Sequence, residues 1–266
     1  MAAETSASTE INLDINDEVA TITLVAPDSR KPPVIDLGVL DRFDERLDRL
    51  ESVGTRAGVV RVVVIRSGSP RFFCAGGNVD ALATLNAATM AEWIERGHSV
   101  LSRIETLPVP TIAVVGGYAL GGGLELALAC DLIYATEQAN FGQTEVRLGF
   151  VTGWGGGRRL AERVGLARAK EISFTGKILG VSEAAEIGLV QFMGDERVVE
   201  EHLAQTVWEI CQGADHAIRA TKHIISQSAF VGPAANLALE REHSVVIVES
   251  SETVRRVQEF LRRRKK

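Results

Sequence analysis

Apolar residues follow two different periods along the first half of the chain. Glu18 to Val25 alternates apolar and polar positions and is rich in β-branched residues, which is typical of a half-buried strand. Val59 to Ile65 and Thr111 to Val115 are almost uninterrupted apolar runs, as expected for parallel strands covered on both faces. Val39 to Leu50 and Met90 to Leu107 instead place apolar side chains at helical spacing. Strands and helices therefore alternate, which predicts an α/β fold with parallel strand pairing.

Helical patterns dominate the second half of the chain. Leu132 to Ala135 is the last segment predicted as a strand, and residues 67–78 are predicted as a loop. Predicted helices then cover 166–174, 182–187, 197–211, 215–229 and 234–262, with a break in the last one near Ser250 and Ser251. We expect three parts: a disordered tail over residues 1–10, an α/β core over 11–194 and a helical C-terminal region over 195–266.

Composition narrows the class of protein. The 266 residues are 45% hydrophobic and 24% charged, as in ordinary globular enzymes, and only 5% are aromatic. So few aromatic residues offer little stacking surface for single-stranded nucleic acid. Cys74, Cys130 and Cys211 lie far apart without a CxxC pair, which indicates neither a disulfide framework nor a zinc site and suits a reducing compartment. The N-terminus has no signal or transit pattern, so we expect a cytoplasmic protein.

The charge of the chain is unevenly distributed. The net charge is −6, yet residues 255–266 hold seven basic side chains and one acidic residue, Glu259. The rest of the chain has 22 basic and 34 acidic residues, a net charge of −12. The basic tail has two interpretations, a solvated helix end that complements the helix dipole or a contact with phosphate groups. Its basic residues are Arg255, Arg256, Arg262, Arg263, Arg264, Lys265 and Lys266.

The longest apolar stretch runs from Val109 to Ile133, but it does not resemble a membrane span. It contains five glycines and the acidic residues Glu125 and Asp131. A carboxylate at the centre of a bilayer costs about 3 kcal/mol on insertion scales. A buried strand, a glycine turn and a short helix are therefore expected here, and no membrane association is predicted.

The glycines of this stretch match no common nucleotide-binding motif. No frame gives G-x-G-x-x-G or a P-loop, and G-x-S-x-G is absent, which disfavours a serine hydrolase. The five histidines form no H-E-x-x-H, and no metal site is predicted. What remains is a glycine turn before a helix, where free N–H groups can stabilise an oxyanion, at roughly 3–4 kcal/mol per donor.

Two glutamates are candidates for acid/base chemistry. Glu125 follows Gly121-Gly122-Gly123-Leu124 in the first turn of the predicted helix, where the helix dipole alone could also favour an acid. Glu145 lies in Phe141–Gly149, predicted to be extended, where it could be an ordinary polar residue. Two carboxylates near one oxyanion turn could divide the roles of acid and base, although their spacing does not show that they meet.

Three segments together resemble the crotonase (enoyl-CoA hydratase/isomerase) superfamily. They are Pro108–Asp131 with its Gly-Tyr-Ala-Leu-Gly-Gly-Gly-x-Glu run, Phe141–Gly149 and Gly153–Leu160, and similarity extends over roughly residues 11–264. The resemblance implies a spiral of ββα units with a helical C-terminal region, assembled as a homotrimer or a hexamer. It also implies an acyl-CoA thioester as substrate, with coenzyme A part of that substrate and no separate cofactor.

The same resemblance assigns roles to individual residues. The oxyanion donors should be the N–H groups of Gly77 and Gly122, and the hydratase branch carries two glutamates, here Glu125 and Glu145. An isomerase would usually keep only the second glutamate. The pair thus favours hydration of an enoyl-CoA by a lyase in fatty acid metabolism, with Glu125 activating water and Glu145 handling the α-proton.

The resemblance also marks substrate-binding candidates, some of which depart from the family pattern. Asn78 stands where an aspartate is common, and Trp154 stands at a small-residue position, where it could either line the acyl pocket or pack against a helix. Phe260 and Arg263 lie in a basic ending that resembles the family's CoA-phosphate contact. The remaining candidates are Ala75 and Ile35. Ala75 lies beside Gly77, and Ile35 lies where the family's loop near the adenine of coenzyme A begins, although the sequence match there is weak.

Other functions fit the sequence less well. Within the superfamily the alternatives are a double-bond isomerase and an acyl-CoA hydrolase. Outside it, the alternative is a non-catalytic oligomer that binds acyl-CoA, or RNA through its arginine tail. The acidic body and the scarcity of aromatic residues disfavour nucleic acid as a partner.

Overall fold

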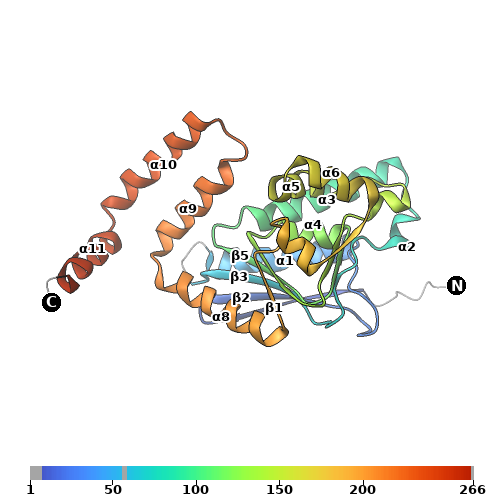
Figure 1. Cartoon of the computed structure of the whole chain (residues 1–266), viewed down its shortest axis with the longest axis horizontal. Helices are drawn as coiled ribbons and strands as arrows, with labels where there is room; N and C mark the ends of the chain where they lie inside the picture. The colour runs from blue at the N-terminus through green and yellow to red at the C-terminus, as the bar shows by residue number, and fades with distance from the viewer. Residues whose placement is uncertain (1–7, 56–58, 265–266) are drawn as a thin grey trace.

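The computed structural model describes residues 8–55 and 59–264 and contains two sheets (Figure 1). In the larger sheet the strand order is β1-β2-β3-β5-β7-β10. The β1–β2 pair is antiparallel, and every other neighbouring pair is parallel. These strands are β1 (Glu10–Asn16), β2 (Val19–Val25), β3 (Val62–Ser67), β5 (Thr111–Val115), β7 (Leu132–Thr136) and β10 (Phe192–Gly194).

The smaller sheet has the order β4-β6-β8-β9, and only β9 is antiparallel to its neighbour. Its strands are β4 (Phe72–Cys74), β6 (Tyr118–Leu120), β8 (Asn140–Gly142) and β9 (Ile178–Gly180). Each of the pairs β3–β4, β5–β6 and β7–β8 places its first strand in the larger sheet and its second in the smaller one. The chain is therefore a spiral of ββα units, and the predicted fold is confirmed.

Helices cover the sheets. On one face of the larger sheet, Val63, Ile65 and Ala113 belong to the main core, together with residues of α1 and α3. On the other face, Val62 and neighbouring apolar residues pack against α8. The helices of the core are α1 (Leu37–Leu50), α2 (Val79–Leu82), α3 (Ala87–Glu105), α4 (Gly122–Leu128), α5 (Gly156–Val164), α6 (Leu166–Thr175) and α7 (Val181–Glu186), with a π-helical turn at Glu51–Thr55 and a 3₁₀-helix, η2, at Glu145–Leu148.

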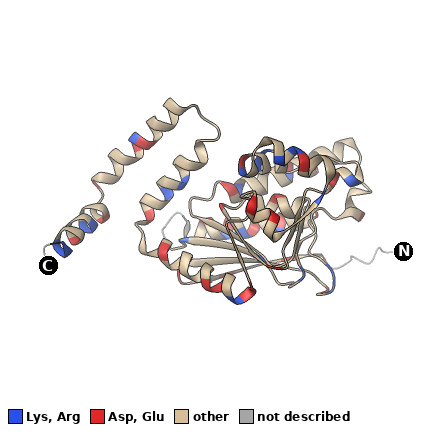
Figure 2. Cartoon of the chain, viewed as in Figure 1, with Lys and Arg blue, Asp and Glu red and all other residues tan. Residues whose placement is uncertain are grey.

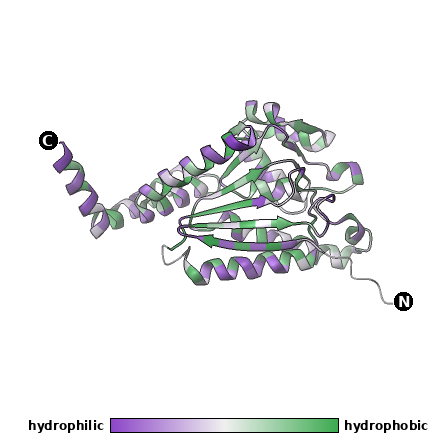
Figure 3. Ribbon diagram, turned by 90° about the horizontal axis from the view of Figure 1, so that it is seen from below, coloured by the Kyte–Doolittle hydropathy of each residue, from purple (hydrophilic) through white to green (hydrophobic). Residues whose placement is uncertain are grey.

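Four helices form the C-terminal region. They are α8 (Glu196–Gln212), α9 (Asp215–Gln227), α10 (Pro233–Val248) and α11 (Ser251–Arg263). The last two extend away from the sheets (Figure 1), and α10 has no buried residue. In Figure 3 these extended helices carry hydrophobic as well as hydrophilic residues. The predicted break is confirmed at Ser250, whose hydroxyl caps α11 by accepting a hydrogen bond from the Thr253 N–H.

The arginines of α11 lie among acidic residues of the same helix (Figure 2). Arg255 is paired with Glu252 and Glu259, and Arg256 is paired with Glu252. Arg262 and Arg263 lie in the last turn, where cations complement the helix dipole. The interpretation as a solvated helix end therefore accounts for these arginines in the single chain. Lys265 and Lys266 lie outside the described residues.

Several local predictions need correction. The predicted loop over 67–78 contains β4, and residues 10–16, for which no strand was predicted, form β1. Of the predicted disordered tail, Ser8 and Thr9 make hydrogen bonds to Asp36 and Val34, while residues 1–7 lie outside the described part. The three-residue strands β6, β8, β9 and β10 were also missed because such short segments show no periodicity. No helix in the described part is long and apolar enough to span a bilayer.

Candidate active site

The glycine turn after β6 presents a free backbone donor. Gly121 has φ 51° and ψ −124°, a conformation that side-chain-bearing residues rarely adopt, and it leads directly into α4. The first helical hydrogen bond runs from the Glu125 N–H to the Gly121 carbonyl (3.0 Å). The N–H of Gly122 precedes this ladder and has no helical acceptor, so it is available to a ligand.

A second glycine loop lies against this turn. Gly76 has φ 89°, and a Cβ atom built there would lie 2.7 Å from the Leu120 carbonyl oxygen and 2.8 Å from the Gly122 nitrogen. Only glycine permits so close an approach. The N–H of Asn78 donates to the Ile35 carbonyl (2.8 Å), and that of Gly76 donates to the sulfur of Cys74 (3.4 Å). These contacts hold Gly77, between them, beside the start of α4.

Glu125 is a buried carboxylate held by backbone donors. It is 2% exposed, and its Oε1 accepts hydrogen bonds from the N–H groups of Trp154 and Gly156, both at 2.8 Å. Burial, followed by the nearby charge of Glu145, raises the pKa of Glu125 to about 7, although the two N–H groups favour the ionised form. Glu125 can therefore gain and lose a proton near neutral pH.

Glu145 begins the 3₁₀-helix η2, so the prediction of an extended segment there is wrong. Its Oε1 accepts a hydrogen bond from the Nε2 of Gln143 at 2.7 Å. Its Oε2 is buried and has no partner within the described residues. Burial raises the pKa of Glu145, which the hydrogen bond from Gln143 partly opposes.

Gln143 was not predicted as a site residue. It is buried, and its own Oε1 also has no partner among the described residues. Its position two residues before Glu145 was the only sequence signal. Because β8 ends at Gly142 and Glu145 begins η2, no regular strand or helix spacing could have placed the amide near the carboxylate.

The two glutamates line the same cavity, of about 100 Å³. The charge of Glu145 is one of the causes that raise the pKa of Glu125, so the two carboxylates interact electrostatically. The glycine donors and both carboxylates thus meet in one place. The lining residues are Ala75, Gly77, Val79, Leu82, Met90, Trp93, Ile94, Gly121, Gly122, Glu125, Thr144, Glu145, Leu148, Phe150, Val151, Gly153 and Trp154.

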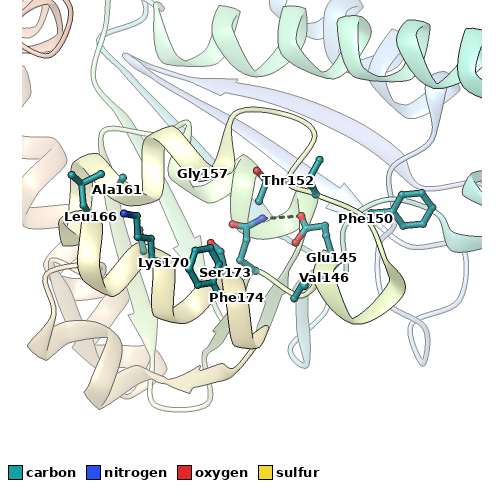
Figure 4. A pocket seen from close by; sticks show the side chains of 13 residues that line it. Glu145, Val146, Phe150, Thr152, Gly157, Ala161, Leu166, Lys170, Ser173 and Phe174 are labelled. Atoms are coloured by element: carbon teal, nitrogen blue, oxygen red, sulfur yellow. Dashed lines mark hydrogen bonds between the residues drawn. The ribbon is translucent and has the colours of Figure 1, made fainter.

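A second cavity, of about 380 Å³, adjoins the first and shares Glu145, Phe150 and Val151 with it. Figure 4 shows Glu145 and Phe150 on one side of this second cavity, and Lys170 and Phe174 of α6 on the other. The dashed line in Figure 4 is the hydrogen bond between Gln143 and Glu145. The second cavity is mainly apolar, and Lys170 is the only cationic residue among those that line it.

The remaining predicted residues fall into different places. Ala75 and Trp154 line the first cavity. Trp154 also packs against α3 by stacking on Trp93, as one of its two alternatives predicted, while its contact with an acyl group stays a prediction. The side chain of Asn78 instead caps α2 by accepting hydrogen bonds from the N–H groups of Asp80 and Ala81. Ile35 is fully buried in the main core, so its side chain is not free to contact a ligand.

Phe260 and Arg263 lie on α11, away from both cavities of their own chain (Figure 1). Phe260 is 61% exposed. Any contact of these residues with a substrate at the site would require another subunit. Among the residues that the structure describes, no group of three His, Cys, Asp or Glu side chains is placed to hold a metal ion.

Comparisons with known proteins point to one family. The family model described as enoyl-CoA hydratase/isomerase matches residues 14–266. The chain is 31% identical over 257 residues to a Bacillus subtilis (strain 168) protein named probable enoyl-CoA hydratase, and the match covers 96% of each chain. It is 35% identical over 185 residues to the mouse methylglutaconyl-CoA hydratase, mitochondrial, covering 68% of this chain and 59% of that protein.

Solved structures show the same architecture. An enoyl-CoA hydratase from Bacillus anthracis superposes with a TM-score of 0.88 at 29% identity, over 96% of both chains. A Thermobifida fusca YX protein in complex with acetoacetyl-CoA superposes with a TM-score of 0.80 at 25% identity, over 90% of this chain and 94% of that one.

Proposed function

This chain belongs to the enoyl-CoA hydratase/isomerase family, and on that premise we propose that it adds water to the α,β double bond of an enoyl-CoA thioester. The observation that carries the proposal is the meeting of buried Glu125 and half-buried Glu145 with two glycine loops in one cavity. The product would be a 3-hydroxyacyl-CoA, which makes the protein a lyase of the enoyl-CoA hydratase type.

The glycine loops would polarise the thioester. The N–H groups of Gly77 and Gly122 donate to the carbonyl oxygen and stabilise the negative charge that develops on it as the enolate forms. Because both donors are backbone groups on rigid loops, they need no rearrangement during the reaction. This polarisation makes the β-carbon electrophilic.

The glutamates would divide the proton transfers. Water lies between them, its oxygen bonds to the β-carbon, and its proton passes to the carboxylate of Glu125. The protonated Glu145 gives its proton to the α-carbon, so the pair as a whole gains and loses one proton. Two observations support this division: Glu125 accepts two backbone hydrogen bonds that favour a carboxylate, whereas the Oε2 of Glu145 is left without a partner and can carry a proton.

Steady-state hydration of a panel of enoyl-CoA thioesters tests the proposal. We expect hydration by the wild-type protein, and a loss of about 10²–10⁴-fold in kcat for Glu125→Gln and for Glu145→Gln. The matched control is Glu137→Gln at an exposed glutamate, which should leave kcat unchanged. Inactivity of the wild type on every substrate, or full activity of both site variants, contradicts the proposal.

Identification of the product separates the other reactions of the superfamily. A shifted double bond indicates an isomerase, and a free acid indicates a hydrolase. The second glutamate favours hydration over these two. The non-catalytic alternative predicts RNA or acyl-CoA binding without turnover, and RNA binding that persists at high salt would favour it.

Assembly as a homotrimer or hexamer, a contact of Phe260 and Arg263 with the CoA phosphates of a neighbouring subunit, and a cytoplasmic location remain predictions. Support for assembly is the exposed apolar surface of α10 and α11. The mouse relative, in contrast, is named as mitochondrial.

A further inference from the structure

The indole of Trp154 is fixed in one position at the wall of the first cavity. Trp154 is 2% exposed, and its Nε1 donates a hydrogen bond to the Trp93 carbonyl oxygen at 3.2 Å. Its ring stacks on that of Trp93, with centroids 5.4 Å apart and planes 29° apart. Stacking, burial and the satisfied N–H together hold this side chain rigidly.

Two glycines make the room that the indole fills. A Cβ atom built at Gly97 of α3 would lie 2.0 Å from the Nε1 of Trp154, and one built at Gly122 would lie 2.5 Å from its Cζ3. The ring therefore occupies the space between α3 and the start of α4. Its edge lies against Gly122, the residue whose N–H is proposed to bind the thioester carbonyl. Trp154 and Gly122 line the same cavity, so an acyl group bound through Gly122 would lie close to the indole.

The rest of the wall is suited to an uncharged acyl group. Apart from Glu125 and Glu145, the residues that line this cavity carry no ionisable side chain. A carboxylate at the end of the acyl group would approach these two glutamates, and like charges at short distance are unfavourable in a buried site. Lys170 lies in the second cavity, on the other side of Glu145.

We propose that Trp154, stacked on Trp93 and seated against Gly97, is the specificity-determining residue that restricts this protein to short, uncharged acyl groups. The proposal rests on the proposed function and names its substrate class. Glu125 accepts its hydrogen bond from the backbone N–H of Trp154 and not from the indole. Substitution of the indole therefore separates specificity from the positioning of the carboxylate.

The wild-type protein gives the first test. We expect kcat/KM to fall at least about tenfold from crotonyl-CoA to trans-2-decenoyl-CoA, and likewise from crotonyl-CoA to glutaconyl-CoA, which ends in a carboxylate. Equal turnover of the long substrate or of the acidic substrate overturns the proposal. Calorimetric binding of butyryl-CoA and decanoyl-CoA tests the pocket without turnover, and tighter binding of the shorter compound is expected. A failure of hydration alone therefore remains distinguishable from a failure of the acyl restriction.

Variants give the second test. Trp154→Ala should raise the ratio of kcat/KM for decenoyl-CoA over crotonyl-CoA at least about tenfold. Trp154→Leu, which keeps more of the buried volume, should raise it in the same direction and covers the case in which the alanine variant does not fold. Phe174→Ala, at an exposed residue that lines only the second cavity, is the matched control and should leave the ratio unchanged. A change in Phe174→Ala, with none in the Trp154 variants, would place the acyl end in the second cavity and refute the proposal.

The contact with Gly97 gives an internal check. Gly97→Ala in the wild type should displace the indole and lower kcat/KM on crotonyl-CoA, because the added methyl group overlaps the ring. In the Trp154→Ala background the same substitution meets no indole and should have little effect. Equal effects of Gly97→Ala in the two backgrounds would contradict the proposed role of Trp154 in acyl specificity.

Discussion

Glu125 shows how burial changes the behaviour of one residue. Its carboxylate is removed from water and lies near a second carboxylate, and the pKa rises from 4.5 to about 7. The folded state therefore holds the proton more tightly than the unfolded state. The stabilisation from this proton is fully present below pH 4.5 and is lost as the pH rises through about 7.

Glu125→Gln should remove this pH dependence. The difference between the two pKa values corresponds to about 3 kcal/mol, so the variant should become more stable than the wild type by up to that amount between pH 5 and pH 8. Urea unfolding at several pH values measures this difference. The exposed Glu137→Gln variant is the control, for which no such trend is expected. A difference between Glu125→Gln and wild type that stays constant across this range would contradict the pKa of Glu125.

At the scale of elements, one ion-pair cluster joins α3 to α5. Glu105, at the end of α3, accepts hydrogen bonds from Arg158 at 2.6 and 2.7 Å and from Arg159 at 2.7 and 3.1 Å. Burial raises the pKa of Glu105, but these hydrogen bonds outweigh burial and hold the pKa below its usual value. Arg159 also donates to the Trp154 carbonyl oxygen at 2.6 Å, so the cluster fixes the loop that holds Glu125.

Glu105→Gln should destabilise the protein by about 2–3 kcal/mol. Arg159 is only 4% exposed and would lose its charged partner, whereas the partial exposure of Glu105 reduces the penalty below that of a fully buried pair. Urea unfolding at pH 7 measures the change. The control is Glu162→Gln, which breaks only the exposed pair with Arg158 and should cost less than about 1 kcal/mol. Equal effects of the two substitutions would show that the buried arginine does not depend on Glu105.

At the scale of the whole molecule, the C-terminal helices expose apolar surface. α10 has no buried residue and leaves Leu237, Val245, Val246 and Val248 exposed. α11 likewise leaves Phe260 and Leu261 exposed. Apolar surface of this kind commonly marks a contact between proteins, and this surface fits the predicted homotrimer or hexamer.

Val246→Glu should shift the protein to a smaller assembly. Val246 is 70% exposed in the single chain, and a charge buried at a subunit contact would be unfavourable there. Sedimentation velocity at micromolar concentration measures the mass. Ala204→Glu, at an exposed position of α8, is the control and should leave the mass unchanged. A wild-type protein that sediments as a monomer would show that the predicted assembly is wrong.

The sequence by itself determined the alternation of strands and helices and the glycine turn before α4. It also identified two glutamates as candidates for acid/base chemistry. Long apolar runs such as Thr111–Val115, and an acid among glycines such as Glu125, are signals that a few neighbouring residues carry. The family resemblance rested on the same local motifs. Local signals of this kind are enough to predict the fold and the family.

Only the tertiary structure decided which distant residues meet. The three-residue strands form because their neighbours in the sheet complete their hydrogen bonds, which no local period reveals. Ile35 is buried and Asn78 caps a helix, because packing and hydrogen bonding set the roles of these side chains. Trp154 reaches Gly97 of α3 and Gly122 at the start of α4, a contact between residues separated in sequence that only the tertiary fold brings together.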